Sequence, residues 1–136
     1  MTDKSEVIGY TKPGGNTESL ASTINDILNL SNKDVLIFWG GTKAVSKNTS
    51  NNGLKYFTPF VKNYNHTNII LLTVPHWYYL HAFPCVTKKV KNFNRKLMKY
   101  MKPDTHISIL EMYHNREYFT SYGLHLNGLG REVICN

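Results

Sequence analysis

Short apolar runs alternate along the chain with segments in which apolar residues recur every three or four positions. The runs Val35–Trp39, Ile69–Val74 and Ile107–Leu110 are too short for typical helices. They predict strands, and the first two are predicted to be buried on both faces, as inside a parallel sheet. Residues 7–10 predict a further short strand, which the turn-forming residues Pro13-Gly14-Gly15 follow.

Helical spacing of apolar residues predicts four helices, over residues 16–28, 54–61, 86–101 and 129–135. Asn16 is suited to cap the first of them. Pro59 predicts either a kink in the second helix or a start near Thr58, because proline is costly inside a regular helix. The segments expected to lack regular structure are the polar loop 44–53 and the irregular stretch 112–127.

The order of these elements predicts one α/β domain over residues 1–136, a length typical of a single domain. Strands that alternate with helices favour right-handed crossovers and a mostly parallel sheet. We therefore expect a three-layer α/β/α sandwich with a flavodoxin-like sheet.

Two loops are predicted to lie at the carboxyl edge of this sheet, where open α/β proteins bind ligands. One begins at Gly40-Gly41, directly after the first long strand, where glycines permit close backbone approach. A tight turn without a ligand is the commoner reason for such a pair. The other loop, His76–Pro84, carries Trp77 and Tyr78, which could cover a pocket, stack on bases or simply pack on the sheet edge.

The composition of the chain indicates which cellular compartment to expect. The chain has formal net charge +7 and two cysteines, Cys85 and Cys135, in no metal or redox spacing, so free thiols in a reducing compartment are expected. We expect no cofactor and no metal. Neither a signal peptide nor a membrane-spanning run is evident, so an intracellular, cytoplasmic protein is the default.

His125 lies in a glycine-flanked segment after the last strand, in Tyr122-Gly123-Leu124-His125-Leu126-Asn127-Gly128. A histidine at that edge is placed to act as a general base. A single loop histidine is more often an ordinary polar residue, so its position alone does not decide the matter.

Several segments together resemble, in the right order, the sequence blocks of the SGNH (GDSL-type) hydrolase superfamily. The likeness is nearest to the esterase-like domain of animal non-LTR retrotransposon proteins. It rests on Lys12-Pro13-Gly14, Trp39-Gly40-Gly41-Thr42-Lys43, residues 67–75, Phe93-Asn94-Arg95-Lys96-Leu97, Asn115-Arg116-Glu117, Phe119-Thr120 and residues 123–130.

The resemblance implies an ester hydrolase with a small ester substrate, His125 as the base, Gly14 and Gly41 near the oxyanion, and no cofactor. The chain departs from that pattern at three places. No Gly-Asp-Ser occurs in the 136 residues, Lys43 stands where the family has an oxyanion asparagine, and Tyr122 stands where it often has an acid. Covalent hydrolysis needs a hydroxyl beside the base and fixed donors at the oxyanion. We therefore expect a catalytically defective domain.

The missing nucleophile block also predicts a structural gap. In the family the first strand lies between the strands that correspond to residues 7–10 and 35–39. The chain is expected to be N-terminally truncated, so that these two strands pair directly or leave an apolar edge open.

An alternative function uses the strongly basic segment 86–102, which contains seven lysines and arginines and no acid. Such a face can bind the phosphates of RNA or single-stranded DNA, and a retrotransposon-derived domain without catalysis would fit. A solvated outer helix face is the commoner explanation. The contacts expected for the alternative are Lys88, Lys89, Lys96 and Lys99.

Overall fold

The computed structural model of the chain describes Glu6, Ile8, residues 18–20, Ser22, residues 29–40, Val45, residues 50–76, Tyr78 and residues 84–112, 115–123 and 125–135. Its elements follow one another as β1 (Val35–Trp39), α3 (Ser50–Asn63), β2 (Asn68–Leu72), α4 (Pro84–Met101), β3 (Ile107–Leu110), η1 (Arg116–Tyr118) and α5 (Gly128–Cys135). The protein is thus a mixed α/β fold, as the alternation of elements predicts.

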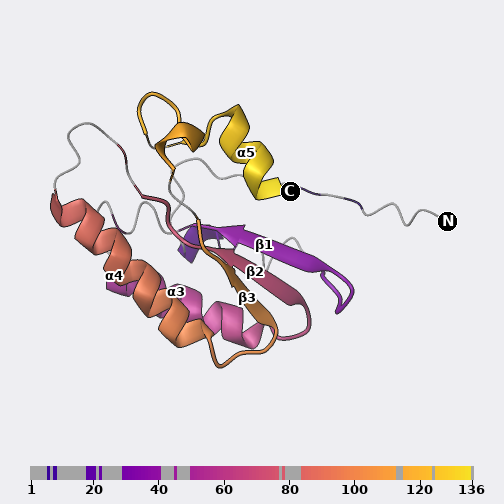
Figure 1. The fold of residues 1–136 in the computed structure, drawn as a ribbon. Coiled ribbons are helices and arrows are strands. Elements are labelled where there is room, and N and C mark those ends of the chain that lie inside the picture. Colours follow the sequence, from indigo (N-terminus) through magenta and orange to yellow (C-terminus); the bar gives the residue numbers. More distant parts are fainter. Residues whose placement is uncertain are drawn as a thin grey trace.

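The strands form a parallel sheet in the order β1-β2-β3. Leu36 is in register with Ile69, and Ile69 with Ile107. Parallel neighbours need crossover connections, and α3 and α4 supply them. Both helices lie on the same side of the sheet (Figure 1).

The core lies between this helix layer and the sheet. Leu36 and Phe38 of β1 point into it with Ile69 and Leu71 of β2, and the ring centroids of Phe38 and Phe57 are 4.4 Å apart. From the helices come buried side chains at helical spacing: Leu54, Phe57, Val61, Val90, Phe93, Leu97 and Met101. The strong amphipathic pattern of residues 86–101 is therefore explained by one buried stripe.

The opposite face of β1 is exposed, and the prediction that this strand is buried on both faces is wrong. Val35, Ile37 and Trp39 are 53%, 64% and 45% exposed. Leu110 of β3 lies on the same face and is 42% exposed. A second helix layer over this face stays a prediction, and in the described part of the chain β1 pairs with β2 alone.

Other boundaries differ less. α3 begins at Ser50, inside the predicted polar loop, and carries Pro59 within it, so a start near Thr58 is wrong. α4, β3 and α5 lie where the sequence predicts them, and Cys85 and Cys135 are free and exposed, as expected. Residues 18–20 and Ser22 are helical, within the predicted first helix. Ile8, the described residue of the predicted strand 7–10, lies outside regular structure, and the remainder of that strand is outside the described residues.

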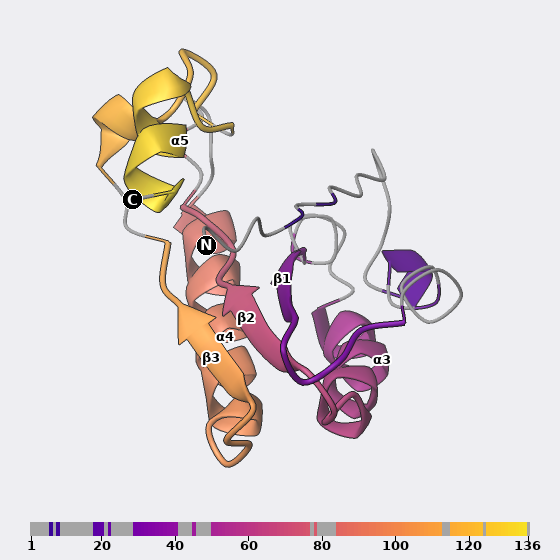
Figure 2. The same cartoon turned by 90° about the vertical axis from the view of Figure 1, so that its right-hand side faces the viewer.

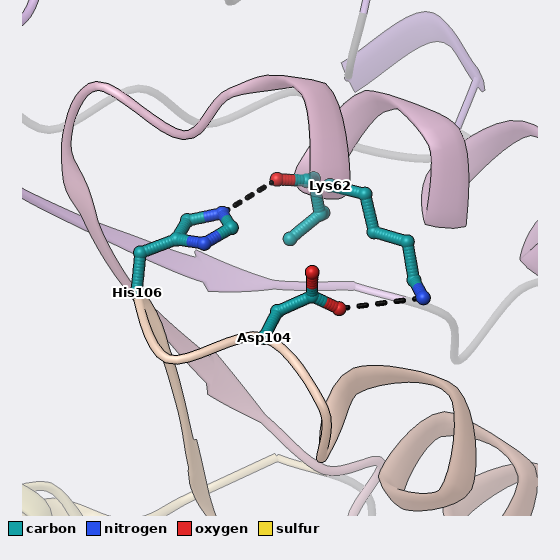
Figure 3. Close-up of polar contacts among 4 residues, drawn as sticks. Lys62, Asp104 and His106 are labelled. Atoms are coloured by element: carbon teal, nitrogen blue, oxygen red, sulfur yellow. Dashed lines mark hydrogen bonds and ion pairs between the residues drawn. The ribbon is translucent and has the colours of Figure 1, made fainter.

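Two polar contacts at the amino end of β3 join α3 to the segment that precedes this strand (Figure 3). The Lys62 ammonium lies 3.3 Å from a carboxylate oxygen of Asp104, in an ion pair without hydrogen-bond alignment. His106 Nε2 donates to the carbonyl oxygen of Val61 at 3.0 Å, since a carbonyl can only accept. These contacts join the segment before β3 to the end of α3.

Candidate functional site

The segment that carries His125 folds back on itself in a short hairpin. Phe119 and Leu126 form an antiparallel bridge, and the Thr120 N–H donates to the carbonyl of His125 at 2.8 Å. Gly123 turns the chain with φ of 71°, a left-handed conformation that glycine adopts without strain. A Cβ on Gly123 would lie 2.6 Å from the backbone and Cβ of Tyr78, so close approach is a second reason for glycine.

Arg116 bonds the backbone of this hairpin at three places. Its guanidinium donates to the carbonyls of Phe119, Thr120 and Ser121 at 3.3, 2.8 and 2.8 Å. Hydrogen bonds from a charged donor are stronger than neutral ones. One side chain therefore fixes three successive carbonyls on the strand that pairs with the His125 strand.

Asn127 ties the other end of the hairpin to the last helix. Its amide donates to the carbonyls of Glu117 and Phe119 at 2.6 and 3.1 Å, while its oxygen accepts from the Gly130 N–H at 2.9 Å. The last contact is an N-cap of α5. Gly130 fits because a Cβ there would collide with the carbonyl oxygen of Tyr118.

Tyr78 brings the segment after β2 against this hairpin. Its N–H donates to the carbonyl of Gly123 at 2.9 Å, and its ring lies 5.2 Å from that of Phe119 and 5.9 Å from the Arg116 guanidinium carbon. Burial raises the pKa of the Tyr78 phenol, and the nearby Arg116 charge opposes that rise. The structure thus places Tyr78 beside the His125 hairpin, at the carboxyl edge of the sheet, with α5 beyond the arrowheads of β2 and β3 (Figure 2).

Two side chains fix the start of the Tyr78 segment. Asn94 of α4 accepts from the Val74 N–H at 2.9 Å and donates to the Val74 carbonyl at 2.8 Å, so its amide replaces a neighbouring strand. The Thr73 hydroxyl accepts from the Met112 N–H at 2.9 Å. Sequence reasoning missed Asn94 as a positioning residue. Its signal is an amide one position after the buried Phe93, near the face that α4 turns to the sheet.

The side chain of His125 is exposed. Within the described residues no hydrogen bond to its ring is found, and Tyr122, which stands at the family's acid position, is 73% exposed. Gly14, Gly41, Lys43 and Trp77 lie outside the described residues, so their predicted roles stay predictions. The site as described is a hydrogen-bonded hairpin that carries one exposed imidazole.

Gly40, directly after β1, packs closely against neighbouring side chains. A Cβ there would lie 2.9 Å from the ring of Phe38 and 3.6 Å from Leu20. The side chain of Leu20 therefore lies near Gly40, which agrees with the apolar face predicted for the first helix. Close packing therefore accounts for glycine at this position without a ligand.

The basic segment forms a row of exposed cations along α4. The exposed cations are separated by three or four residues, so they lie on one helix face. They are Lys88, Lys91, Arg95 and Lys99 of α4, with Lys102 in the turn directly after the helix. Lys89 and Lys96 are half-buried beside that row. The row covers about 21 Å along the helix at 1.5 Å per residue. Neither α3 nor α4 contains an acidic residue, so no carboxylate within these helices offsets the charge.

The described residues contain no cluster of three or more histidine, cysteine, aspartate or glutamate side chains that could hold a metal ion. Among them there is also no helix long and apolar enough to cross a membrane.

A solved structure shares this fold. It is a provisionally named platelet activating factor from Streptococcus pneumonia, which aligns with TM-score 0.72 at 18% sequence identity. The alignment covers 89% of this chain and 65% of that chain. At such low identity the likeness shows the α/β fold alone. No protein-family model and no curated protein sequence matches the chain.

Proposed function

We propose that the chain is an SGNH (GDSL-type) hydrolase-like domain that does not hydrolyse esters as it stands. The observation that carries the proposal is the His125 hairpin at the carboxyl edge of a parallel sheet. Arg116 and Asn127 bond its backbone, and the Tyr78 N–H joins it to the segment after β2. Open α/β folds bind their ligands in loops at that edge. The fold shared with a solved platelet activating factor structure supports the same class.

The argument against turnover is chemical. An imidazole alone gives general base catalysis, whereas covalent ester hydrolysis also needs a positioned nucleophile and oxyanion donors. The sequence has no Gly-Asp-Ser to supply the first, and Lys43 in place of asparagine lacks a fixed amide for the second. Loss of one oxyanion donor costs about 10²–10³ in rate, and loss of the nucleophile removes the covalent path.

The test is hydrolysis of a short-chain aryl ester such as p-nitrophenyl acetate by the chain and by its His125→Ala variant. We expect both proteins to give a slow, non-saturable rate, with the wild type at most slightly faster because its exposed imidazole acts as a simple general base. His125→Gln serves as a second variant that keeps a polar side chain at this exposed position. Saturable turnover that disappears in both variants would refute the proposal.

We propose nucleic-acid binding through α4 as the second candidate function, because four exposed cations of this helix and Lys102 directly after it lie in one row, with no acid in α3 or α4. The partner would be RNA or single-stranded DNA, bound through its phosphates. Fluorescence anisotropy of a labelled oligonucleotide over a salt series measures it. We expect the salt slope to fall by about 3 when Lys88, Lys89, Lys96 and Lys99 are changed to glutamine, at roughly 0.7 per single-strand phosphate contact. Unchanged binding would exclude this candidate.

A further inference from the structure

A groove lies between α3 and α4, which run side by side on the sheet (Figures 1 and 2). Its volume of about 420 Å³ is within the range of small-molecule sites, about 300–1,000 Å³. Its lining residues are Leu54, Lys55, Thr58 and Pro59 of α3 with Lys96 and Tyr100 of α4. Because Lys55, Pro59 and Tyr100 are exposed, this α3–α4 groove is open to solvent.

The ring of Tyr100 is the aromatic part of the groove wall. Tyr100 is 44% exposed, and with the described residues it makes no hydrogen bond, ring stack or cation–π contact. Leu54 and Pro59 supply the apolar remainder of the wall. A free aromatic ring in such a place can stack on a nucleobase, and it accepts any base because every base has a π-face.

Cations lie on both sides of the α3–α4 groove. Lys99, which directly precedes Tyr100, belongs to the exposed row on α4, and Lys55 is exposed on α3. Neither of the two has a carboxylate partner among the described residues. Lys96 already has an interaction within the protein, so it contributes to the groove wall without a free charge. The groove therefore lies beside positive charge that attracts a polyanion.

The position of Tyr100 relative to the row favours a strand with unpaired bases. Successive residues of a helix are turned by about 100°, so Tyr100 lies beside the row and not within it. The bases of a duplex are paired and turned inward, so a duplex brings only phosphates to α4. A single strand can keep its phosphates on the row and turn one base sideways into the groove.

We propose that the α3–α4 groove takes one unpaired base of a nucleic-acid strand whose phosphates lie on the α4 row. The base stacks on Tyr100 beside Pro59 and Leu54, and Lys55 contacts a neighbouring phosphate. The inference rests on the nucleic-acid candidate above and deepens it, because it adds an unpaired base to the ligand and names the residue that holds it.

Fluorescence anisotropy with labelled oligo(dT) of about 12 nucleotides tests the stack. Tyr100→Ala should weaken binding about 5- to 150-fold, the worth of stacking one base. The salt slope should stay the same, because no cation is removed. Tyr100→Phe keeps a ring and should bind as the wild type does. Tyr56→Ala is the matched control, since Tyr56 is a 50% exposed tyrosine of α3 that does not line the groove, and it should also bind as the wild type does.

Two further ligands separate stacking from phosphate binding. A fully paired duplex and an abasic strand of the same length keep their phosphates but offer no free base, so Tyr100→Ala should leave their affinity unchanged. Oligo(rU) should lose as much affinity in Tyr100→Ala as oligo(dT), because a stacked base and a phosphate contact do not read the 2′-hydroxyl. A loss confined to one of the two strands would contradict the assignment.

The outcomes distinguish this inference from the nucleic-acid candidate. If no oligonucleotide binds, both are wrong. If oligo(dT) binds with a salt slope that the lysine variant lowers, while Tyr100→Ala binds as tightly as the wild type, the candidate stands and the base site is wrong. An equal loss in Tyr56→Ala, or an equal loss for the duplex, would also overturn the base site.

Discussion

The amide of Asn94 offers the sharpest test of how the site is held. It makes two hydrogen bonds to the backbone of Val74, at 2.9 and 2.8 Å, and Val74 is fully buried. Asn94→Ala removes both bonds and leaves the Val74 N–H and C=O without partners. An unsatisfied buried group costs about 1–3 kcal/mol, so the two together should cost about 2–6 kcal/mol.

Helix propensity acts in the opposite direction and can be measured separately. Alanine is favoured over asparagine inside a helix by roughly 0.6 kcal/mol. Asn92→Ala in the same helix is the matched control, because it replaces the same residue type at an exposed position. We expect Asn92→Ala to be neutral or slightly stabilising, and the two variants to differ by about 2–6 kcal/mol.

Urea denaturation followed by circular dichroism gives both free energies of unfolding, with similar m values if both variants remain two-state. Hydrogen exchange then locates the effect, since the Val74 amide should lose protection in Asn94→Ala and keep it in Asn92→Ala. A difference below about 0.5 kcal/mol between the variants, within the range of ordinary surface substitutions, would refute the reasoning.

Three further predictions concern the hairpin and the sheet. Gly123→Ala should destabilise the protein by at least about 1–2 kcal/mol in urea denaturation, because φ is 71° and Tyr78 is in contact, whereas Gly128→Ala, with open space around its Cβ, should not. Ile37→Thr should lower the binding of a hydrophobic dye without loss of stability, since Ile37 is 64% exposed; unchanged dye binding would mean that this face is covered. Burial raises the pKa of Tyr78 in the folded protein, so its neutral phenol contributes fully to stability below the unfolded pKa near 10. That contribution is lost as pH rises through the folded pKa, because the half-buried phenol must then ionise. A pH series of unfolding free energies should therefore fall less steeply above pH 10 in Tyr78→Phe, and identical slopes would contradict this.

The sequence predicts the regular elements well where one periodicity dominates. In α4, apolar residues repeat at helical spacing without interruption, and the structure buries that face at Val90, Phe93, Leu97 and Met101. In β1, the pattern of apolar residues does not predict which face is exposed. All five of its residues are apolar, so no polar alternation marks the face that is exposed. The start of α3 is hidden for a related reason, because its first turn is made of Ser50, Asn51 and Asn52, residues typical of loops.

The site is less predictable because its contacts run from side chains to the backbone of other segments. His125 and the glycines around it are visible in the sequence. The bonds of Arg116 to three carbonyls and of Asn127 to two carbonyls and an N–H depend on the hairpin, which has no periodic pattern. The exposed row of cations is predicted only in part. Of the four expected contacts, Lys88 and Lys99 lie in the row, whereas Lys89 and Lys96 are half-buried beside it.

Labelling with a fluorophosphonate tests the central claim most directly, because this reagent reacts with an activated serine whatever the natural substrate. We predict no adduct on the intact chain by mass spectrometry, since no serine is assigned as a nucleophile beside His125. A stoichiometric adduct on a single serine that is absent in His125→Ala would show a working nucleophile and base, and would contradict the account.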